Sequence, residues 1–328
     1  MYEIIISSLI SFFVTLIAIP KLIKYLKKIN LEVKDQNKQN KPLVPSSGGI
    51  AVMAGIFMAI MFFIAVSFYN YKDSRIHVLG GILTIVMITF IGFVDDLIIK
   101  KNKESSYGLK QWQKPLLTLV AAIPLITVYS GGTIVKIPII GSFIGRTDFG
   151  IIYILVLIPI GIVGAANMIN LLAGFNGLEA GMGIIYTGML SLYAYINNSP
   201  MGLLFSLITF SALIAFCIYN KYPAKIFPGD SLTYLLGASL ACIAILGNME
   251  KPALICSIPF FIEFILKARS KFKAQSYGYY KDNKIHSQYR KIYSVTHILT
   301  RTGKFTEKQI TYILILFELM VSILIFII

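Results

Sequence analysis

Long apolar segments recur along the whole chain and limit its fold more than any other feature. Ten segments approach the roughly 20 residues that a membrane-spanning helix needs. They lie at residues 4–24, 49–69, 78–98, 115–130, 150–171, 179–197, 200–219, 231–248, 252–268 and 308–328. Hydrophobic residues make up 56% of the 328 residues and charged residues only 14%, too little charge to cover a soluble globule. The sequence therefore predicts an all-α integral membrane protein, a bundle of about ten transmembrane helices.

Positive charges are distributed unevenly between the loops of this predicted bundle. If the segments alternate across the membrane, all but five of the 30 Lys and Arg residues lie on one side. The five exceptions are Lys72, Arg75, Lys136, Arg146 and Lys251. Because lysine-rich loops stay in the cytoplasm, we expect a multi-pass cell-membrane protein with both termini outside. Loop placement also accounts for the net charge of +15, so that charge does not indicate nucleic acid as a partner.

The connecting loops are too short to form a separate soluble domain. Residues 1–328 are therefore expected to form one polytopic membrane domain, with the lipid bilayer as its first partner. Two stretches between residues 131 and 150 contain residues that favour β-strands and predict a small extracellular β-hairpin. A homodimer is compatible with such a bundle, although no sequence marker specifies one.

Three acidic residues lie at predicted cytoplasmic helix ends. Asp95 and Asp96 close the third segment, and Asp230 precedes the eighth. Adjacent carboxylates at a membrane helix end are costly unless cations or a metal offset their charge. A hydrated helix end or an N-terminal cap would also explain acidic residues there. Lys114, which ends the loop after Asp96, could neutralise a carboxylate or hold a phosphate.

Three asparagines follow at the same predicted membrane face. Asn167 and Asn170 share one side of a helix, and Asn176 lies between Gly174 and Gly177. Asparagine is costly in lipid, so these side chains indicate either interhelical hydrogen bonds or a binding site. Together with the carboxylates they form an oxygen-rich set that suits a hard cation such as Mg²⁺, with Mn²⁺ as the alternative.

Two further features admit more than one interpretation. The basic loop from Lys267 to Lys308 would attract anionic lipid or a polyanionic substrate, and the turn at Gly48 and Gly49 opens a helix that could bind phosphate. Glu263 and Glu318 lie inside spans; Glu263 can pair with Lys267 four residues on, while Glu318 has no evident partner. An ion-coupled transporter and a non-catalytic lipid-binding scaffold therefore remain alternatives at this point.

Taken in order, these motifs resemble the polyprenyl-phosphate N-acetylhexosamine-1-phosphate transferase family. The resemblance covers most of the chain and rests on residues 44–49, 92–96, 112–114, 167–179 and 227–230. Bacterial members carry aspartates in the asparagine-containing loop, whereas residues 173–177 read Ala-Gly-Phe-Asn-Gly. This chain therefore looks like the archaeal and eukaryotic enzymes that start N-glycan synthesis on dolichyl phosphate.

The resemblance implies an activity. The protein would transfer N-acetylglucosamine-1-phosphate from UDP-GlcNAc to a polyprenyl (dolichyl) phosphate on the cytoplasmic membrane face and release UMP. Mg²⁺ would be required. Another UDP-N-acetylhexosamine is the alternative donor, and the ion-coupled transporter is the alternative class of protein.

The resemblance also implies roles for individual residues. Asp95, Asp96, Lys114 and Asp230 would be catalytic, with Asn170 and Asp230 as the metal ligands. Gly48, Gly49, Asn167, Asn176, Phe227, His297 and Arg301 would bind substrate, with Asn176 hydrogen-bonded to the uracil and Phe227 stacked on it. The segment of His297 and Arg301 only partly matches the Arg-His-Arg sequence that precedes Thr-Gly-Lys in the eukaryotic enzymes.

Overall fold

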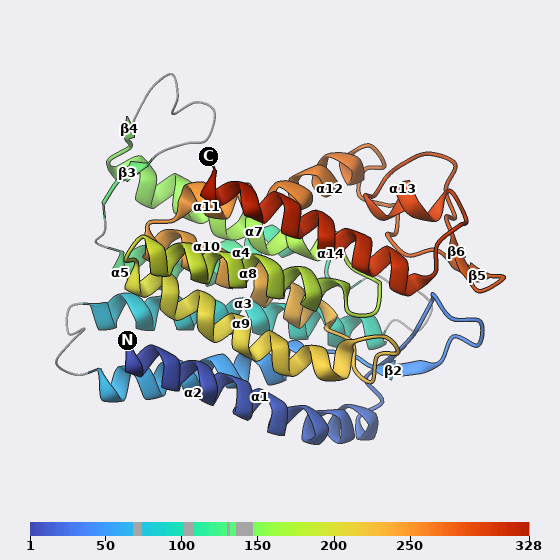
Figure 1. The fold of residues 1–328 in the computed structure, drawn as a ribbon, viewed down its shortest axis with the longest axis horizontal. Coiled ribbons are helices and arrows are strands. Elements are labelled where there is room, and N and C mark those ends of the chain that lie inside the picture. Colours follow the sequence, from blue (N-terminus) through green and yellow to red (C-terminus); the bar gives the residue numbers. More distant parts are fainter. Residues whose placement is uncertain (68–73, 102–107, 130–131, 136–146, 328) are drawn as a thin grey trace.

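A computed structural model describes residues 1–67, 74–101, 108–129, 132–135 and 147–327, which form a bundle of helices (Figure 1). Its helices are α1 (Tyr2–Lys28), α2 (Gly49–Val66), α3 (Arg75–Lys101), α4 (Gln113–Ala121), α5 (Ile123–Val128), the π-helix η2 (Tyr153–Leu157), α7 (Ile158–Leu171), α8 (Leu178–Ile196), α9 (Pro200–Asn220), α10 (Gly229–Gly247), α11 (Glu250–Cys256), α12 (Ile258–Ala268), α13 (Thr296–Thr300), α14 (Glu307–Ile323) and the 3₁₀-helix η3 (Leu324–Phe326).

All ten predicted segments are helical, but they do not all qualify as spans. In the described part of the chain, seven helices are long and apolar enough to cross a membrane. They are α1, α2, α3, α9, α10, the η2–α7 helix and the α14–η3 helix. The protein is therefore a mainly helical multi-pass membrane protein, and the count of ten crossings stays a prediction.

Prolines coincide with breaks in three of the predicted segments. The fourth divides into α4 and α5 just before Pro124, and the ninth divides at Ser257 just before Pro259. In the fifth, the π-helical turn η2 ends just before Pro159. Proline lacks an N–H group and restricts the preceding residue, so it favours a helix start over a helix interior.

Short strands form three antiparallel pairs: β1 (Glu32–Lys34) with β2 (Leu43–Pro45), β3 (Ile134–Val135) with β4 (Thr147–Asp148), and β5 (Tyr279–Lys281) with β6 (Lys284–His286). The pair of β3 and β4 lies at the base of the expected hairpin. Residues 136–146 lie outside the described part of the chain, so the hairpin itself stays a prediction. Both termini lie toward the β3–β4 end of the bundle, whereas β2, β5, β6 and α13 lie at the other end (Figure 1).

α10 is the central helix of the bundle. Of the candidate spans in the described part of the chain it is the most deeply buried, with 78% of its apolar stretch inside the protein. It packs on α2, α3, α7 and α9. At Gly237 a Cβ atom would lie 2.4 Å from the backbone oxygen of Ala165 in α7, so only glycine allows this approach. This packing gives the N-terminus of α10 a fixed position among its neighbours.

Candidate active site

The polar groups expected at the active site meet around the N-terminus of α10. α3 carries Asp95 and Asp96, α4 carries Lys114, α7 carries Asn170, and Asp230 is in the first turn of α10. The side chains of Asp95 and Asp96 are buried, with exposed fractions of 0% and 5%. A buried carboxylate needs cations or hydrogen-bond donors to replace its hydration, so its partners indicate its role.

Asp95 shares a cation with Asp230. The Lys114 ammonium forms ion pairs with both carboxylates, and its Nζ atom lies 3.2 Å from Asp230 Oδ2. The backbone N–H of Leu109 also donates to Asp95, and Asn170 Nδ2 donates to Asp230 Oδ2 at 3.2 Å. One ammonium group between two acids marks a place where positive charge is favourable.

Asp96 follows Asp95 directly but has different partners. Its carboxylate accepts hydrogen bonds from the N–H groups of Asp230 at 2.9 Å and Ser231 at 3.3 Å, and from the Ser47 hydroxyl at 2.5 Å. The first N–H groups of a helix lack intrahelical partners, and a negative charge there also complements the helix dipole. Asp96 therefore caps α10 from another helix and holds Asp230 in place.

Gly48 and Gly49 bring two stretches of backbone into contact. Their N–H groups donate to the carbonyl oxygens of Phe227 at 2.9 Å and Pro228 at 3.2 Å. A Cβ atom on Gly49 would lie 2.3 Å from the nitrogen of Leu232. These glycines thus hold the loop before α2 against the start of α10. Contact of Gly48, Gly49 and the half-buried Phe227 ring with a substrate stays a prediction.

The two asparagines of α7 differ in their contacts. Asn170 is linked to α10 twice, because its Oδ1 atom also accepts a hydrogen bond of 2.7 Å from the Thr233 hydroxyl. Asn167 instead donates to the Thr118 hydroxyl at 3.2 Å and to the carbonyl oxygen of Val163 at 2.8 Å. Asn170 therefore belongs to the acidic cluster, whereas Asn167 connects α7 to α4.

Asn176 takes part in a second polar cluster. Its backbone and side-chain nitrogens donate to Glu307 at 2.9 and 2.6 Å, and Nδ2 also donates to Asp35 at 2.9 Å. Lys38 forms ion pairs with both of these acids. The residue sits in a loop between α7 and α8, while its partners come from the β1–β2 connection and α14.

His297 is fully buried and both of its ring nitrogens have partners. Nδ1 accepts from the N–H of Tyr293 at 3.2 Å, and Nε2 lies 2.9 Å from the carbonyl oxygen of Gln275, to which it donates. Burial lowers the pKa of the imidazole from its ordinary value, which fits this neutral form. Arg301 is exposed at the end of α13. The contacts of His297 are structural, and binding of sugar by either residue stays a prediction.

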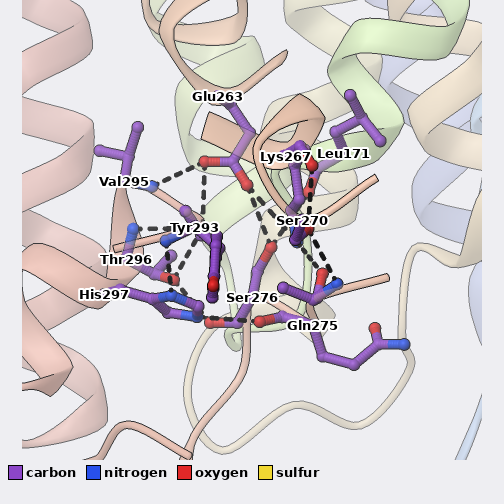
Figure 2. A network of polar contacts seen from close by, with 12 residues as sticks. Leu171, Glu263, Lys267, Ser270, Gln275, Ser276, Tyr293, Val295, Thr296 and His297 are labelled. Carbon is purple, nitrogen blue, oxygen red and sulfur yellow. Dashed lines mark hydrogen bonds and ion pairs between the residues drawn. The ribbon is translucent and has the colours of Figure 1, made fainter. Parts of the chain in front are cut away.

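Glu263 holds the segment between α12 and α14 that contains His297 (Figure 2). Its carboxylate accepts hydrogen bonds from the Ser294 hydroxyl at 3.0 Å and the Val295 N–H at 2.7 Å, and it forms the expected ion pair with Lys267 at 3.6 Å. Lys267 Nζ also donates to the carbonyl oxygen of Ala274 at 2.7 Å. These contacts give Glu263 a structural role, so it does not support an ion pathway.

The acidic cluster fits a hard cation that is shared with a substrate. The described residues contain no group of three or more His, Cys, Asp or Glu side chains that could hold a metal alone. Mg²⁺ usually takes one or two carboxylates and completes its shell with water and substrate phosphates. Asp230 supplies such a carboxylate, Asn170 supplies a neighbouring amide, and Asp95 Oδ2 is buried without a hydrogen bond besides its ion pair with Lys114.

Five polar residues of these clusters were not expected from the sequence: Asp35, Lys38, Ser47, Thr233 and Glu307. Two of them lie close to motifs identified from the sequence: Ser47 precedes Gly48, and Thr233 follows Asp230 by three residues. Their position in the sequence could therefore have indicated that they belong to the site. Asp35, Lys38 and Glu307 lie far in sequence from their partner Asn176. Nothing local in the sequence marks these three residues.

Comparison with known proteins gives consistent matches. Glycosyl transferase family 4 matches residues 78–248. The chain is 38% identical to a putative UDP-N-acetylglucosamine–dolichyl-phosphate N-acetylglucosaminephosphotransferase of Saccharolobus solfataricus, over 93% of this chain and 90% of that protein. It is 37% identical to the protein of the same name from Sulfolobus acidocaldarius, over 98% and 94%. A Dictyostelium discoideum UDP-N-acetylglucosamine–dolichyl-phosphate N-acetylglucosaminephosphotransferase is 27% identical over 92% and 82%.

Proposed function

Since the chain belongs to glycosyl transferase family 4, we propose that it transfers N-acetylglucosamine-1-phosphate from UDP-GlcNAc to a polyprenyl phosphate of the dolichyl type and releases UMP. The two proposed substrates are those that appear in the names of its relatives. The observation that carries the proposal is the placement of Lys114 between Asp95 and Asp230 at the N-terminus of α10. Another UDP-N-acetylhexosamine is the alternative donor.

The reaction joins two polyanions, so the site must offset negative charge. An oxygen of the lipid phosphate attacks the β-phosphorus of UDP-GlcNAc. A new P–O bond forms, the bond from that phosphorus to the bridging oxygen breaks, and UMP leaves with the electron pair. A prenyl phosphate is already largely ionised at neutral pH, so the attack needs no strong base. Positioning and charge stabilisation are then the main contributions of the protein.

The acidic cluster consists of Asp95, Asp96, Lys114, Asn170 and Asp230, and we assign these tasks to its individual residues. Lys114 is placed to meet phosphate oxygens, and Asp95 orients its ammonium group. Asp96 holds the start of α10 and is a positioning residue, because N–H and O–H donors occupy its carboxylate. If a base takes part, Asp95 is the better placed of the two carboxylates. Asp230 and Asn170 would hold Mg²⁺, which supplies positive charge to the diphosphate.

The remaining roles concern the substrates and the membrane. Asn176 is proposed to meet the uracil and Phe227 to stack on it. The apolar lipid tail would remain in the bilayer, since moving it into water is unfavourable. The lysine-rich loops support a site on the cytoplasmic face, with both termini outside. The product would begin a lipid-linked glycan of the N-glycosylation type.

UMP release from protein purified in detergent tests this function. The assay contains UDP-GlcNAc and a short polyprenyl phosphate, with Mg²⁺ or with EDTA. We expect UMP only when both lipid and metal are present. Asp230→Asn should abolish release, whereas Glu318→Gln should retain it, because Glu318 lies outside the cluster and accepts a hydrogen bond from the Ser322 hydroxyl. UMP release that does not depend on lipid or on metal would contradict the proposal. So would an equal loss of UMP release in the two variants.

A further inference from the structure

Asn176 is held in one orientation by two acids from distant parts of the chain. Its Nδ2 atom donates to Glu307 at 2.6 Å and to Asp35 at 2.9 Å. Ionised carboxylates can only accept hydrogen bonds, whereas an amide can donate through nitrogen or accept through oxygen. The two acids therefore fix which end of the Asn176 amide faces them, and a flipped amide would place its oxygen against two other oxygens.

Charge and backbone contacts support this arrangement. Lys38 forms ion pairs with both Asp35 and Glu307, which offsets their mutual repulsion. The backbone N–H of Asn176 donates to Glu307 as well, at 2.9 Å. Asn37 Nδ2 ties the β1–β2 connection to the carbonyl oxygen of Gly174 at 2.7 Å. The amide is thus fixed by contacts at its side chain, its backbone and its loop.

The other end of the amide has no partner. Asn176 is 3% exposed, and its Oδ1 atom is buried without a hydrogen bond. An unpaired buried acceptor is costly, and a ligand that donates to it would recover that cost. Asn37 and Glu307 also border a cavity of about 200 Å³. The cluster therefore borders open volume through Glu307 and contains one unsatisfied acceptor.

We propose that Asp35 and Glu307 are positioning residues that keep the Asn176 oxygen as a hydrogen-bond acceptor and thereby select uracil over cytosine in the donor nucleotide. Uracil carries a hydrogen on N3 and donates there, whereas N3 of cytosine is unprotonated and accepts. This inference rests on the proposed function, because that function brings a uridine nucleotide to Asn176.

Binding of UDP and of CDP to the purified protein, measured by calorimetry with Mg²⁺ present, tests the inference without requiring turnover. The wild type should bind UDP about 10- to 100-fold more tightly than CDP, the ratio expected when the buried Asn176 oxygen meets the N3–H donor of uracil in one ligand and the N3 acceptor of cytosine in the other. Asn176→Ala should lower this ratio to within about threefold.

Asp35→Asn and Glu307→Gln provide the decisive variants. Each replaces an acceptor-only carboxylate by an amide that can also donate, so the Asn176 amide can turn over. We expect each variant to lower the UDP-to-CDP ratio, and the double variant to lower it as far as Asn176→Ala does, because all act through one amide.

Gln309→Ala is the matched control. Gln309 completes the capping box of α14 with Thr306, in the same turn as Glu307, and its side chain bonds to Thr306 and not to Asn176. This variant weakens the same helix start and should leave the nucleotide ratio unchanged. A ratio that Gln309→Ala lowers equally, or that Asp35→Asn and Glu307→Gln leave at the wild-type value, would overturn the inference.

The two proposals fail in different ways. Lipid-dependent UMP release together with an unchanged nucleotide ratio in the variants would reject the inference and leave the proposed function standing. A wild type that binds neither nucleotide would reject the inference as well. Absence of UMP release from a folded protein whose UDP-to-CDP ratio falls in Asp35→Asn and Glu307→Gln would instead reject the transferase reaction and uphold the role of Asp35 and Glu307.

Discussion

The backbone N–H of Asp230 donates a 2.9 Å hydrogen bond to Asp96 Oδ1, while the side chain of Asp230 shares Lys114 with Asp95. Two neighbouring carboxylates therefore act on different parts of one residue. Asp96 fixes the backbone at the start of α10, and Asp95 helps to place the cation beside the Asp230 carboxylate. This division leads to different expectations for the two acids.

Asp96→Asn should mainly reduce stability. An asparagine side chain has one acceptor oxygen, so its NH₂ group would face a backbone N–H or the Ser47 hydroxyl at this site. We expect the free energy of unfolding to fall by about 1–3 kcal/mol, seen as a lower melting temperature in detergent. A melting temperature equal to that of the wild type would contradict the capping role.

Asp95→Asn should mainly reduce turnover. The substitution leaves Lys114 with one charged partner and misplaces its ammonium group, so UMP release should fall by about 10²- to 10³-fold. The melting temperature should change less than in Asp96→Asn. The result would count against the division of roles if Asp95→Asn were fully active.

Lys114→Met tests the need for a cation between the two acids. The methionine side chain is similar in length but removes the positive charge beside Asp95 and Asp230. UMP release should fall by about 10²- to 10³-fold. Lys114→Arg keeps the charge and serves as the control, with activity above that of the methionine variant. Turnover of Lys114→Met within about threefold of the wild type would show that the ammonium group is dispensable.

Gly229→Ala should destabilise the start of α10. Gly229 has a φ of +66°, and a Cβ atom would lie 2.4 Å from Asp96 Oδ2 and 2.7 Å from the nitrogen of Ser47. Strain and steric overlap together should cost about 1–3 kcal/mol. Gly161→Ala in α7 is the control, because no atom lies within 4 Å of its Cβ position. Equal melting temperatures for the two variants would contradict the close approach.

Because His297 is buried, we expect the free energy of unfolding to fall in mild acid. Its pKa is lowered in the folded protein, so below the ordinary histidine value the unfolded chain binds more protons than the folded one. Stability should be complete above that value and should decline as the pH falls toward the lower folded pKa. His297→Gln should flatten the decline in a melting-temperature series, and an unchanged slope would assign the decline to other groups.

The sequence was sufficient to predict the gathering of Asp95, Lys114, Asn170 and Asp230, because alternation of the ten predicted spans put these motifs on one predicted membrane face. It could not separate the roles of Asp95 and Asp96. Adjacent helical residues point about 100° apart, and which direction meets α10 depends on helix packing. The length of the apolar segments likewise located all ten helical regions, but it could not decide how many of them cross the membrane.

Asn176 shows the other limit of sequence reasoning. Its motif indicated a binding residue, yet its partners lie 141 residues before it and 131 residues after it. Side-chain contacts over such separations leave no local pattern. Glu263 was easier, since its partner Lys267 lies one helical turn away and the predicted ion pair is confirmed.

The fate of the β-phosphate distinguishes transfer of sugar-1-phosphate from transfer of the sugar alone. UDP-GlcNAc carrying ³²P only at that phosphate is incubated with the purified protein, polyprenyl phosphate and Mg²⁺, and the lipid and nucleotide products are separated. Transfer of sugar-1-phosphate predicts labelled lipid and unlabelled UMP in equal amounts. If the label leaves with the nucleotide as UDP, the sugar alone is transferred, and the proposed transfer of sugar-1-phosphate is contradicted.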